Sequence, residues 1–532
     1  MLSKKRITLV GILLILVIGG AYSYFRLIVG KRLTPESGAN LVPEQASMMT
    51  FINTDPAVWS QLNQYGTPEA QALWEENLEQ LEQEILPSHE INYEDDIAPW
   101  LSGIAIAYLP SLNPFTQDQN FLIIAGITNS LQAGNFLRSL DGSEGTEVTQ
   151  RQYQGVTITE VETADGDRAS GAMVEGYLLF SQRERIIEQA IDTAQGQPSF
   201  ASEAGMEEIL ARGLNLDKPA VQVYLNDDQQ WFKNPFFNQG SKIIESGVMG
   251  FEFQPEGIHS QTLVLSTATD FLTLSPNESH LLAALPERTI AVINGHQLDQ
   301  VWSQFVERSE KNPFLRTGLS LMRRWARSRE IDLDQDVFRW LDGEYAIALF
   351  PTTESTLPNL PLAGGILIES SQRDVGEAAL SKFGKIAAEN PFLEKTTATL
   401  GKTQVTTWRD RSEQPVVSYG WLEDKRLMVT LATPFRSFAQ PQGKKTFGNS
   451  TPFTAMAQRL PDSNLGYIYF NMNQTIPFLE SLPQNPLQDI SSEGKALLNS
   501  TQQMALTVSQ PAPSFRQLDL FLSLESTPNE SN

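Results

Sequence analysis

Cysteine is absent from the 532 residues of the chain, and histidine occurs only four times. The lack of cysteine excludes disulfide bonds, thiolate zinc sites, cysteine-ligated iron–sulfur clusters and a cysteine nucleophile. Basic residues are also scarce: 39 lysines and arginines stand against 63 aspartates and glutamates, which gives a net charge of −24. This acidity argues against a nucleic acid as the main partner, because a phosphate backbone requires a basic surface.

The motifs of common catalytic and cofactor sites are missing as well. The four histidines are far apart and match no zinc-binding pattern, and no G-x-S-x-G motif occurs. Residues 401–403 (GKT) resemble the end of a phosphate-binding loop, but Thr396 stands where its first glycine belongs. Residues 332–336 resemble the start of a calcium loop, but Val337 replaces the required glycine, so we interpret their aspartates as turn and capping residues. We therefore expect no cofactor, no metal and no catalytic residue.

A long hydrophobic run occurs near the N-terminus. Residues 7–25 carry no charge, and a helix of this length spans about 28 Å, close to the hydrocarbon thickness of a bilayer. The basic residues within 1–6 favour a cytoplasmic N-terminus and an uncleaved anchor over residues 7–29. A signal peptide cleaved after Ser23 is the alternative.

The chain beyond this segment contains two pairs of similar blocks. Residues 93–110 and 333–351 share an aspartate, a tryptophan and a glycine in the same order, followed by an apolar run and a proline. Residues 43–61 and 286–304 both begin with Pro-Glu and contain Trp-Ser-Gln at the same distance from the proline. Two matching blocks in one order predict two tandem related units.

The pattern of apolar residues predicts an α+β fold with largely antiparallel sheets and interspersed helices. The expected segments are the cytoplasmic residues 1–6, the anchor 7–29, a linker 30–40, unit 41–275, a linker 276–281, unit 282–525 and a disordered tail 526–532. The expected strands include 104–109, 121–128, 156–161, 176–181, 221–226, 261–266, 345–350, 365–369, 404–409, 427–431, 465–471 and 518–524. The expected helices include 130–140, 183–194, 376–388 and 451–460.

The D-x-x-x-W-L-x-G block predicts the same local structure in each unit. Its aspartate can cap a short helix, its tryptophan then faces the core, and its glycine suits a left-handed helix end. These positions are Asp96, Trp100 and Gly103 in the first block, and Asp336, Trp340 and Gly343 in the second.

Two helices at corresponding places carry opposite charges. Residues 68–85 contain six glutamates and no basic residue, whereas residues 313–329 are rich in arginine. We interpret both faces as solvated surfaces, with two alternatives: contact between the two helices across the units, or docking of the arginine helix on anionic lipid headgroups. The arginines are Arg316, Arg323, Arg324, Arg327 and Arg329, and the apolar residues of that helix are Leu315, Leu319, Met322 and Trp325.

A second candidate interaction segment covers residues 231–237. It places four aromatic side chains in a loop-like stretch, which is either a local cluster or an exposed interaction patch. The aromatic residues are Trp231, Phe232, Phe236 and Phe237.

The order of these features resembles a family of membrane-anchored bacterial proteins, common in cyanobacteria, that is catalogued as domain of unknown function 3352. The resemblance covers residues 41–524 and is carried by the anchor, the proline-headed strands and the repeated D-x-x-x-W-L-x-G block. It implies an envelope location, in the periplasm or the thylakoid lumen, and no catalytic residues.

We therefore expect a single-pass envelope protein that binds a protein partner or an apolar small molecule at the junction of its two repeats, and that is not an enzyme. Two alternatives stay open. One is a periplasmic or lumenal hydrolase that uses acidic residues, for which a cleft with two nearby carboxylates would be required. The other is a scaffold or assembly factor for a membrane complex.

Overall fold

The structure is a computed structural model of the 532-residue chain. It describes residues 30–73, 76, 93–110, 120–133, 147–162, 168–226, 245–266, 276–311, 313–356, 361–439, 445–482 and 485–526. These residues form two compact units. Unit 1 contains the described residues from 30 to 266 together with 525 and 526, and unit 2 contains those from 276 to 524.

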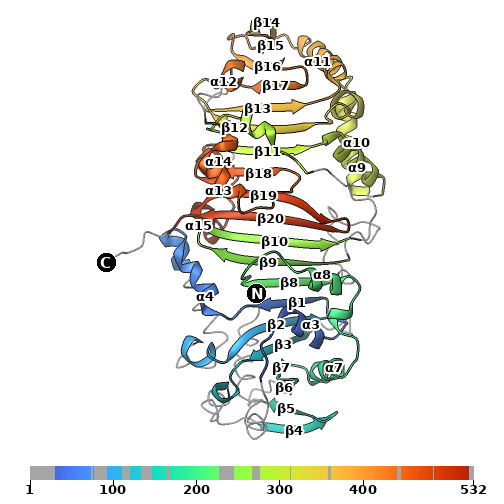
Figure 1. Ribbon diagram of the computed structural model, residues 1–532. Helices are drawn as coiled ribbons and strands as arrows, with labels where there is room; N and C mark the ends of the chain where they lie inside the picture. Colours follow the sequence, from blue (N-terminus) through green and yellow to red (C-terminus); the bar gives the residue numbers. More distant parts are fainter. Residues whose placement is uncertain are drawn as a thin grey trace, which may run out of the picture. The chain divides into compact units, whose positions relative to one another are not determined.

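Unit 1 is built on an antiparallel sheet whose strands alternate between buried and partly exposed residues. Neighbouring strands pair in the order β4-β5-β6-β7-β3-β2-β1-β8-β9-β10 (Figure 1). The strands are β1 (Met48–Ile52), β2 (Leu101–Leu109), β3 (Asn120–Ile127), β4 (Glu147–Tyr153), β5 (Val156–Glu162), β6 (Arg168–Val174), β7 (Tyr177–Ser181), β8 (Val221–Asn226), β9 (Ser246–Gln254) and β10 (Gly257–Leu265). Its helical segments include α3 (Pro35–Leu41), α4 (Pro56–Trp59), η2 (Tyr93–Ile97), α7 (Glu184–Ala194) and α8 (Met206–Arg212).

Unit 2 is also built on an antiparallel sheet. Its strands pair in the order β14-β15-β16-β17-β13-β12-β11-β18-β19-β20, which is the order of unit 1 strand for strand. The strands are β11 (Ala291–His296), β12 (Glu344–Pro351), β13 (Leu362–Glu369), β14 (Glu394–Leu400), β15 (Thr403–Arg409), β16 (Pro415–Trp421), β17 (Arg426–Leu431), β18 (Tyr467–Asn471), β19 (Thr501–Ala512) and β20 (Phe515–Leu524).

The helices of unit 2 lie in two groups at opposite ends of the strands (Figure 1). One group contains α9 (Leu298–Lys311), α10 (Pro313–Arg327) and α11 (Arg373–Ala388). The other contains α12 (Phe435–Ala439), α13 (Thr451–Ala457), α14 (Met472–Ser481) and α15 (Ser492–Ser500). The described part of the unit also contains the short helical turns η5 (His280–Ala284), η6 (Leu333–Phe338) and η7 (Phe447–Asn449).

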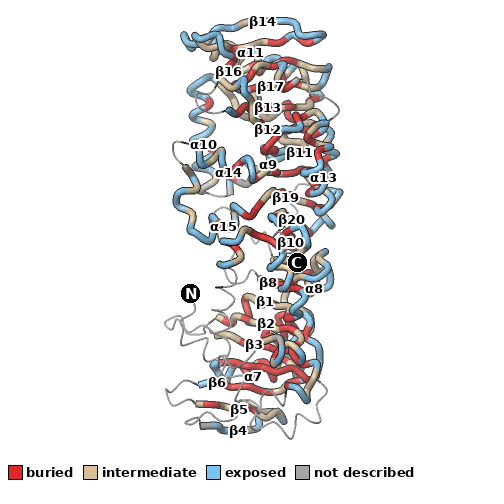
Figure 2. The backbone as a smooth tube through the Cα atoms, turned by 90° about the vertical axis from the view of Figure 1, so that its left-hand side faces the viewer, coloured by how far each residue is buried: buried red, intermediate tan, exposed pale blue. Residues whose placement is uncertain are grey.

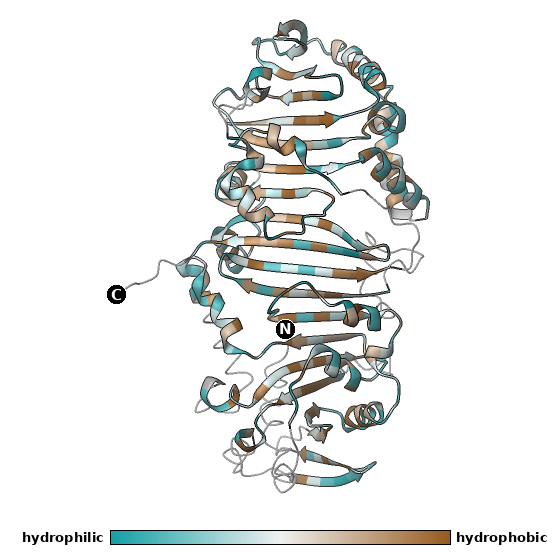
Figure 3. Cartoon of the chain, in the orientation of Figure 1, coloured by the Kyte–Doolittle hydropathy of each residue, from teal (hydrophilic) through white to brown (hydrophobic). Residues whose placement is uncertain are grey.

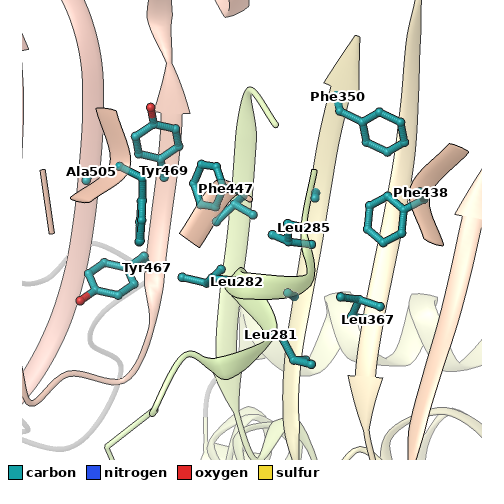
Figure 4. Close-up of a cluster of buried hydrophobic side chains, with 14 of the residues drawn as sticks. Leu281, Leu282, Leu285, Phe350, Leu367, Phe438, Phe447, Tyr467, Tyr469 and Ala505 are labelled. Atoms are coloured by element: carbon teal, nitrogen blue, oxygen red, sulfur yellow. The ribbon is translucent and has the colours of Figure 1, made fainter. Parts of the chain in front are cut away.

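The main core of unit 2 lies on one face of its sheet. Alternate residues of β12, among them Ala346, Ala348 and Phe350, point to this face and are buried. The turns η5 and η7 and the helices α12 and α13 cover it with leucine and aromatic side chains (Figure 4). Figure 2 shows that buried residues concentrate in the strands, while α10 is mostly exposed.

Phe438 of α12 packs directly on the backbone at Gly365 of β13. A Cβ atom at position 365 would lie only 2.1 Å from the Phe438 ring, so only glycine leaves room for this aromatic side chain. The glycine therefore serves packing, because its φ angle is not in the left-handed region.

The predicted mixed fold with antiparallel sheets is confirmed, and each of the twelve expected strands corresponds to an observed one. Several strands were not expected from the sequence, among them β4, β6, β9, β14, β16 and β19. They are rich in polar or small residues, so they lack a clear hydrophobic alternation. The expected helix 130–140 is described only at its start.

The D-x-x-x-W-L-x-G block adopts a similar local structure in both units. Trp100 and Trp340 are buried, and each indole N–H donates to the backbone carbonyl four residues earlier, at 2.7 Å to Asp96 and 3.2 Å to Asp336. The expected capping role of Asp336 is wrong, because the N-cap of η6 is Asp332, whose carboxylate accepts the N–H groups of residues 334 and 335. Asp96 likewise lies inside η2 rather than before it.

The glycines of this block do not end a helix. Gly103 has a φ of +115° but lies inside β2, next to a shift in the pairing register with β3. The left-handed conformation expected for Gly343 is wrong. A Cβ atom there would lie 2.5 Å from the carbonyl oxygen of Glu369, so this glycine permits a close approach of two backbone segments.

Candidate functional site

The face of the unit 2 sheet opposite the main core carries an uninterrupted row of aliphatic side chains. Strand pairing aligns one aliphatic residue in each of seven neighbouring strands. Since strands lie about 4.8 Å apart, the row extends over roughly 29 Å. From β20 to β17 this aliphatic row contains Leu520, Leu506, Ile468, Ile293, Ile347, Ile366 and Val429. Figure 3 shows hydrophobic residues recurring along these strands.

The face is open at the centre of the aliphatic row and beside it, where Leu349 and Leu431 follow two residues after the row residues Ile347 and Val429. Ile293, Ile347, Leu349 and Leu431 are between 39% and 42% exposed, although isoleucine and leucine on a sheet face are usually covered. Gly364 lies between Leu349 and Leu431 on the intervening strand and presents no side chain there. Neighbouring exposed aliphatic residues on one face indicate a surface that contacts another apolar molecule.

Helices cover this face on both sides of the open centre. On one side Phe478 of α14 packs with Ala291 and Phe470. On the other side α11 and η6 pack over a cluster that includes Ile368 and Val429. In Figure 2, α10 and α14 lie on the same side of the strands, whereas α13 lies on the other. The open centre is therefore bordered by helices.

The aliphatic row contains no titratable or hydrogen-bonding side chain. The arrangement can bind by burial of apolar surface but offers no acid, base, nucleophile or ligand for a metal. Its chemistry is that of an apolar surface.

The helices α9 and α10 form a second notable surface of unit 2. Arg323 points inward, with Nη2 at 2.9 and 2.8 Å from the two carboxylate oxygens of Asp334, which also accepts the indole N–H of Trp302 at 2.7 Å. Burial alone would raise the pKa of Asp334, but the hydrogen bonds from Arg323 and Trp302 outweigh it and lower that pKa. Arg323 therefore holds α10 to η6, and its expected place on a solvated or docking face is wrong.

The outward face of α10 is partly apolar. Leu319 and Ala326 are buried, whereas Leu321, Met322 and Trp325 are exposed, Trp325 by 59%. Met322 and Trp325 are therefore not packed against the unit as Leu319 is. The Arg323 side chain, at the position next to Met322, occupies the packed side instead.

The remaining arginines of this segment are on the surface. Arg316, Arg324 and Arg327 are exposed, and Arg327 is close enough to Asp334 to contribute to its lowered pKa. The Arg329 guanidinium lies 4.5 Å from the centre of the Trp325 ring, which is a cation–π distance.

The aspartates at 332–336 are all engaged by donors of the protein. Asp332 caps η6, Asp334 binds Arg323, and Asp336 accepts the backbone N–H of Asp332 at 2.7 Å and the ammonium of Lys382 at 2.5 Å. Asp332 therefore has the expected capping role, whereas Asp334 and Asp336 bind basic side chains. The hairpin turn between β14 and β15 contains Gly401 at a φ of +61°, so residues 401–403 do not open a helix as a phosphate loop would.

Acidic residues also line a cavity of about 480 Å³ in unit 1, which bears on the hydrolase alternative. Asp55 and Asp217 are among its lining residues, together with Arg32 and Lys218. The Asp55 carboxylate accepts the N–H of Ala57 at 2.9 Å as the N-cap of α4, so it has a structural function. The hydrolase alternative stays a prediction.

Several sequence predictions lie outside the described residues. They are the anchor 7–29, the aromatic residues Trp231, Phe232, Phe236 and Phe237, and most of the acidic helix 68–85. Among the residues that the structure does describe, which begin at Gly30, no helix is both long and hydrophobic enough to cross a bilayer. The aliphatic row was not expected from the sequence. The only signal for it was the alternation within single strands, which does not reveal how strands align.

Comparisons with known proteins give a family but no activity. A family model described as "Protein of unknown function (DUF3352)" matches residues 7–524, which confirms the resemblance inferred from the repeated block. No curated protein is detectably similar in sequence. Two crystal forms of TP0453, at 12% and 11% identity, match 45% and 44% of this chain and 82% and 79% of theirs, each with a TM-score of 0.25.

Proposed function

The chain belongs to the DUF3352 family, which carries no assigned activity, and we propose that it is an envelope protein that binds an extended aliphatic molecule, such as a lipid acyl chain, on unit 2. The observation that carries this proposal is the open centre of the aliphatic row. The proposed site lies on unit 2 alone, and the expected site at the junction of the two units stays a prediction.

The composition of the row favours an acyl chain over an extended peptide. An extended peptide laid on this face would bring unpaired backbone N–H and C=O groups against side chains that offer no hydrogen bond, which is costly. An acyl chain has no such groups. It occupies about 15 Å within one leaflet of a bilayer, and the row extends over roughly 29 Å, so the row is long enough for it.

The envelope location rests on the sequence. We propose that residues 7–29 form an uncleaved anchor and that both units lie on the far side of the membrane, in the periplasm or the lumen. Retention of the full-length chain in membranes after alkaline extraction, with protection of both units from protease in sealed cells, is the expected result. Release of the chain, or an N-terminus that begins after Ser23, would contradict the anchor.

We also propose that the two units arose by duplication. The shared strand order and the two pairs of matching sequence blocks support this interpretation. A common origin explains why one architecture occurs twice, but it does not require that both copies bind the same molecule.

Binding of a fluorescent fatty acid, cis-parinaric acid, to the full-length purified protein tests the proposed function. We expect saturable binding that weakens by about tenfold in the variant Ile347→Asn/Leu349→Asn, because two polar amides then replace the open centre of the row. Leu400→Asn is the matched control, since Leu400 is 44% exposed in the same unit but lies in β14, outside the row. Equal affinity of both variants, or a co-purifying protein displaced by Ile347→Asn/Leu349→Asn, would contradict the proposal.

A further inference from the structure

We propose that α10 is a membrane-docking helix that lays its outward face on an anionic phospholipid surface. The proposal is independent of the aliphatic row, because it rests on other residues of unit 2. Its occupant is a lipid surface with phosphate headgroups, and three observations support it: an exposed apolar stripe, a basic stripe beside it, and a rigid attachment of the helix to the unit.

The apolar stripe runs along one side of α10. Gly318, Leu321, Met322 and Trp325 follow one another at spacings of one, three or four residues, so they lie on the same side of the helix. The three side chains are among the most exposed large hydrophobic residues of the described chain. A Cβ atom at Gly318 would meet no other atom within 4 Å, so this position is open. Tryptophan beside leucine and methionine is typical of a helix that lies in a membrane interface.

The basic stripe borders the apolar stripe at Arg324. Arg316, Arg324 and Arg327 are exposed. At about 100° per residue, Arg324 lies about 60° from Leu321 around the helix, and Arg316 and Arg327 lie further round on the same flank. No aspartate or glutamate occurs within α10 itself, although the whole chain has a net charge of −24. This local concentration of arginine complements anionic headgroups, whereas the acidic remainder of the protein would be repelled by them.

The inner side of α10 fixes its orientation. Two hydrogen bonds join Arg323 to Asp334, and Trp302 of α9 donates to the same carboxylate while its ring stacks on Phe338 with centroids 3.9 Å apart. Leu319 and Ala326 complete the packed side. The helix is therefore folded before it meets a membrane, and docking requires no ordering of the chain.

A local probe on α10 separates docking of the helix from attachment through residues 7–29. The chain has no cysteine, so Met322→Cys gives a single position for an environment-sensitive fluorophore in the full-length protein. The labelled protein is reconstituted into vesicles of phosphatidylcholine, with or without phosphatidylglycerol, that contain a nitroxide-labelled lipid as quencher. The anchor segment is the same in every sample, so only the surroundings of α10 differ.

We expect the nitroxide lipid to quench the fluorophore at 322 in phosphatidylglycerol vesicles, and about tenfold less in phosphatidylcholine alone. High salt and the variant Arg316→Glu/Arg324→Glu should both abolish the difference, because each removes the electrostatic attraction. Both arginines are exposed, so the variant keeps the fold, which far-UV circular dichroism checks. Leu400→Cys, labelled in the same way, is the control position and should show no dependence on lipid charge.

Three results would overturn the proposal. Quenching at 322 that is independent of phosphatidylglycerol would mean that the anchor alone brings α10 to the membrane. Absence of quenching in both kinds of vesicle would mean that the helix does not dock. The same result is then required when separate vesicles with the nitroxide lipid are added to the reconstituted protein. Protection of the label by an acidic protein in the absence of vesicles would mean that the surface binds a protein instead.

Discussion

Units 1 and 2 share one strand order, but the residues of unit 1 that correspond to the aliphatic row of unit 2 are chemically different. Counted from the matching prolines Pro43 and Pro286, Thr50 of unit 1 corresponds to Ile293 of unit 2. The row through Thr50 contains two threonines and ends in a buried phenylalanine, so its aliphatic surface is interrupted. It consists of Thr262, Met249, Val223, Thr50, Ile106, Ile123 and Phe180.

The comparison shows that strand order and the chemistry of the second face are independent. A sheet needs one apolar face for its core, and the pairing of backbone groups does not depend on the side chains of the other face. An open aliphatic surface in unit 2 and an interrupted one in unit 1 are therefore compatible with the same strand order. Three predictions test how far the two units differ, in order of decreasing effect on stability.

The largest effect is expected at the contact between Phe438 and Gly365, where unit 1 has the buried Leu122 of β3 at the position that corresponds to the glycine. Phe438→Ala should destabilise unit 2 by about 4 kcal/mol, since it empties a fully buried site. Adding Gly365→Leu should restore part of the loss, although Gly365→Leu alone is expected to clash with the ring. Hydrogen exchange of β13 measures the effect, with β3 as the internal reference. Equal loss of protection in both strands would contradict the prediction.

A smaller effect is expected at Asp334, which has no equivalent contact at the matching tryptophan of unit 1. Trp59 donates its indole N–H to the backbone carbonyl of Asn53 at 2.6 Å, whereas Trp302 donates to a carboxylate. Because the folded pKa of Asp334 is lowered, its stabilising contribution is present above the ordinary aspartate pKa and is lost as the pH falls through the lowered value.

Asp334→Asn should therefore cost about 1.5 kcal/mol at neutral pH, a value reduced for partial exposure of the ion pair. It should also weaken the acid sensitivity of the contact between α9–α10 and η6. Hydrogen exchange of α9 and α10 at neutral and acidic pH measures both effects, and Asp374→Asn, on the surface of α11, is the control. An unchanged difference between the two pH values would rule out this role of Asp334.

The smallest effect on stability is expected for the exchange of residues between the two rows. Ile293→Thr should cost only about 0.5 kcal/mol, because the side chain is largely open to solvent, but should weaken fatty-acid binding about threefold. Thr50→Ile in unit 1 is the matched control and should leave that binding unchanged. If both substitutions alter binding equally, the open centre of unit 2 is not the site.

The sequence carried the information for single elements but not for their alignment. Alternation of period two predicts β8 at its observed bounds, and the repeated block predicts the buried Trp100 and Trp340. The aliphatic row is assembled from seven strands between β11 and β20, and nothing local indicates that Ile293 pairs with Ile468. The periodicity of α10 was also misleading, because Arg323 can pack inward only where Asp334 receives it.

The strand order has a further consequence for how the protein is made. In each unit the first strand lies inside the sheet. One edge of β1 pairs with β2, which is synthesised soon after it, but the other edge pairs with β8, which is synthesised much later. The same holds for β11, whose two partners are β12 and β18. At a synthesis rate of roughly 5–20 residues per second, the second edge of β1 stays unpaired for about 10 to 30 s. During that interval the nascent chain presents a free strand edge that other chains can join. During synthesis each unit must therefore be kept from pairing with other chains until its last three strands have been made.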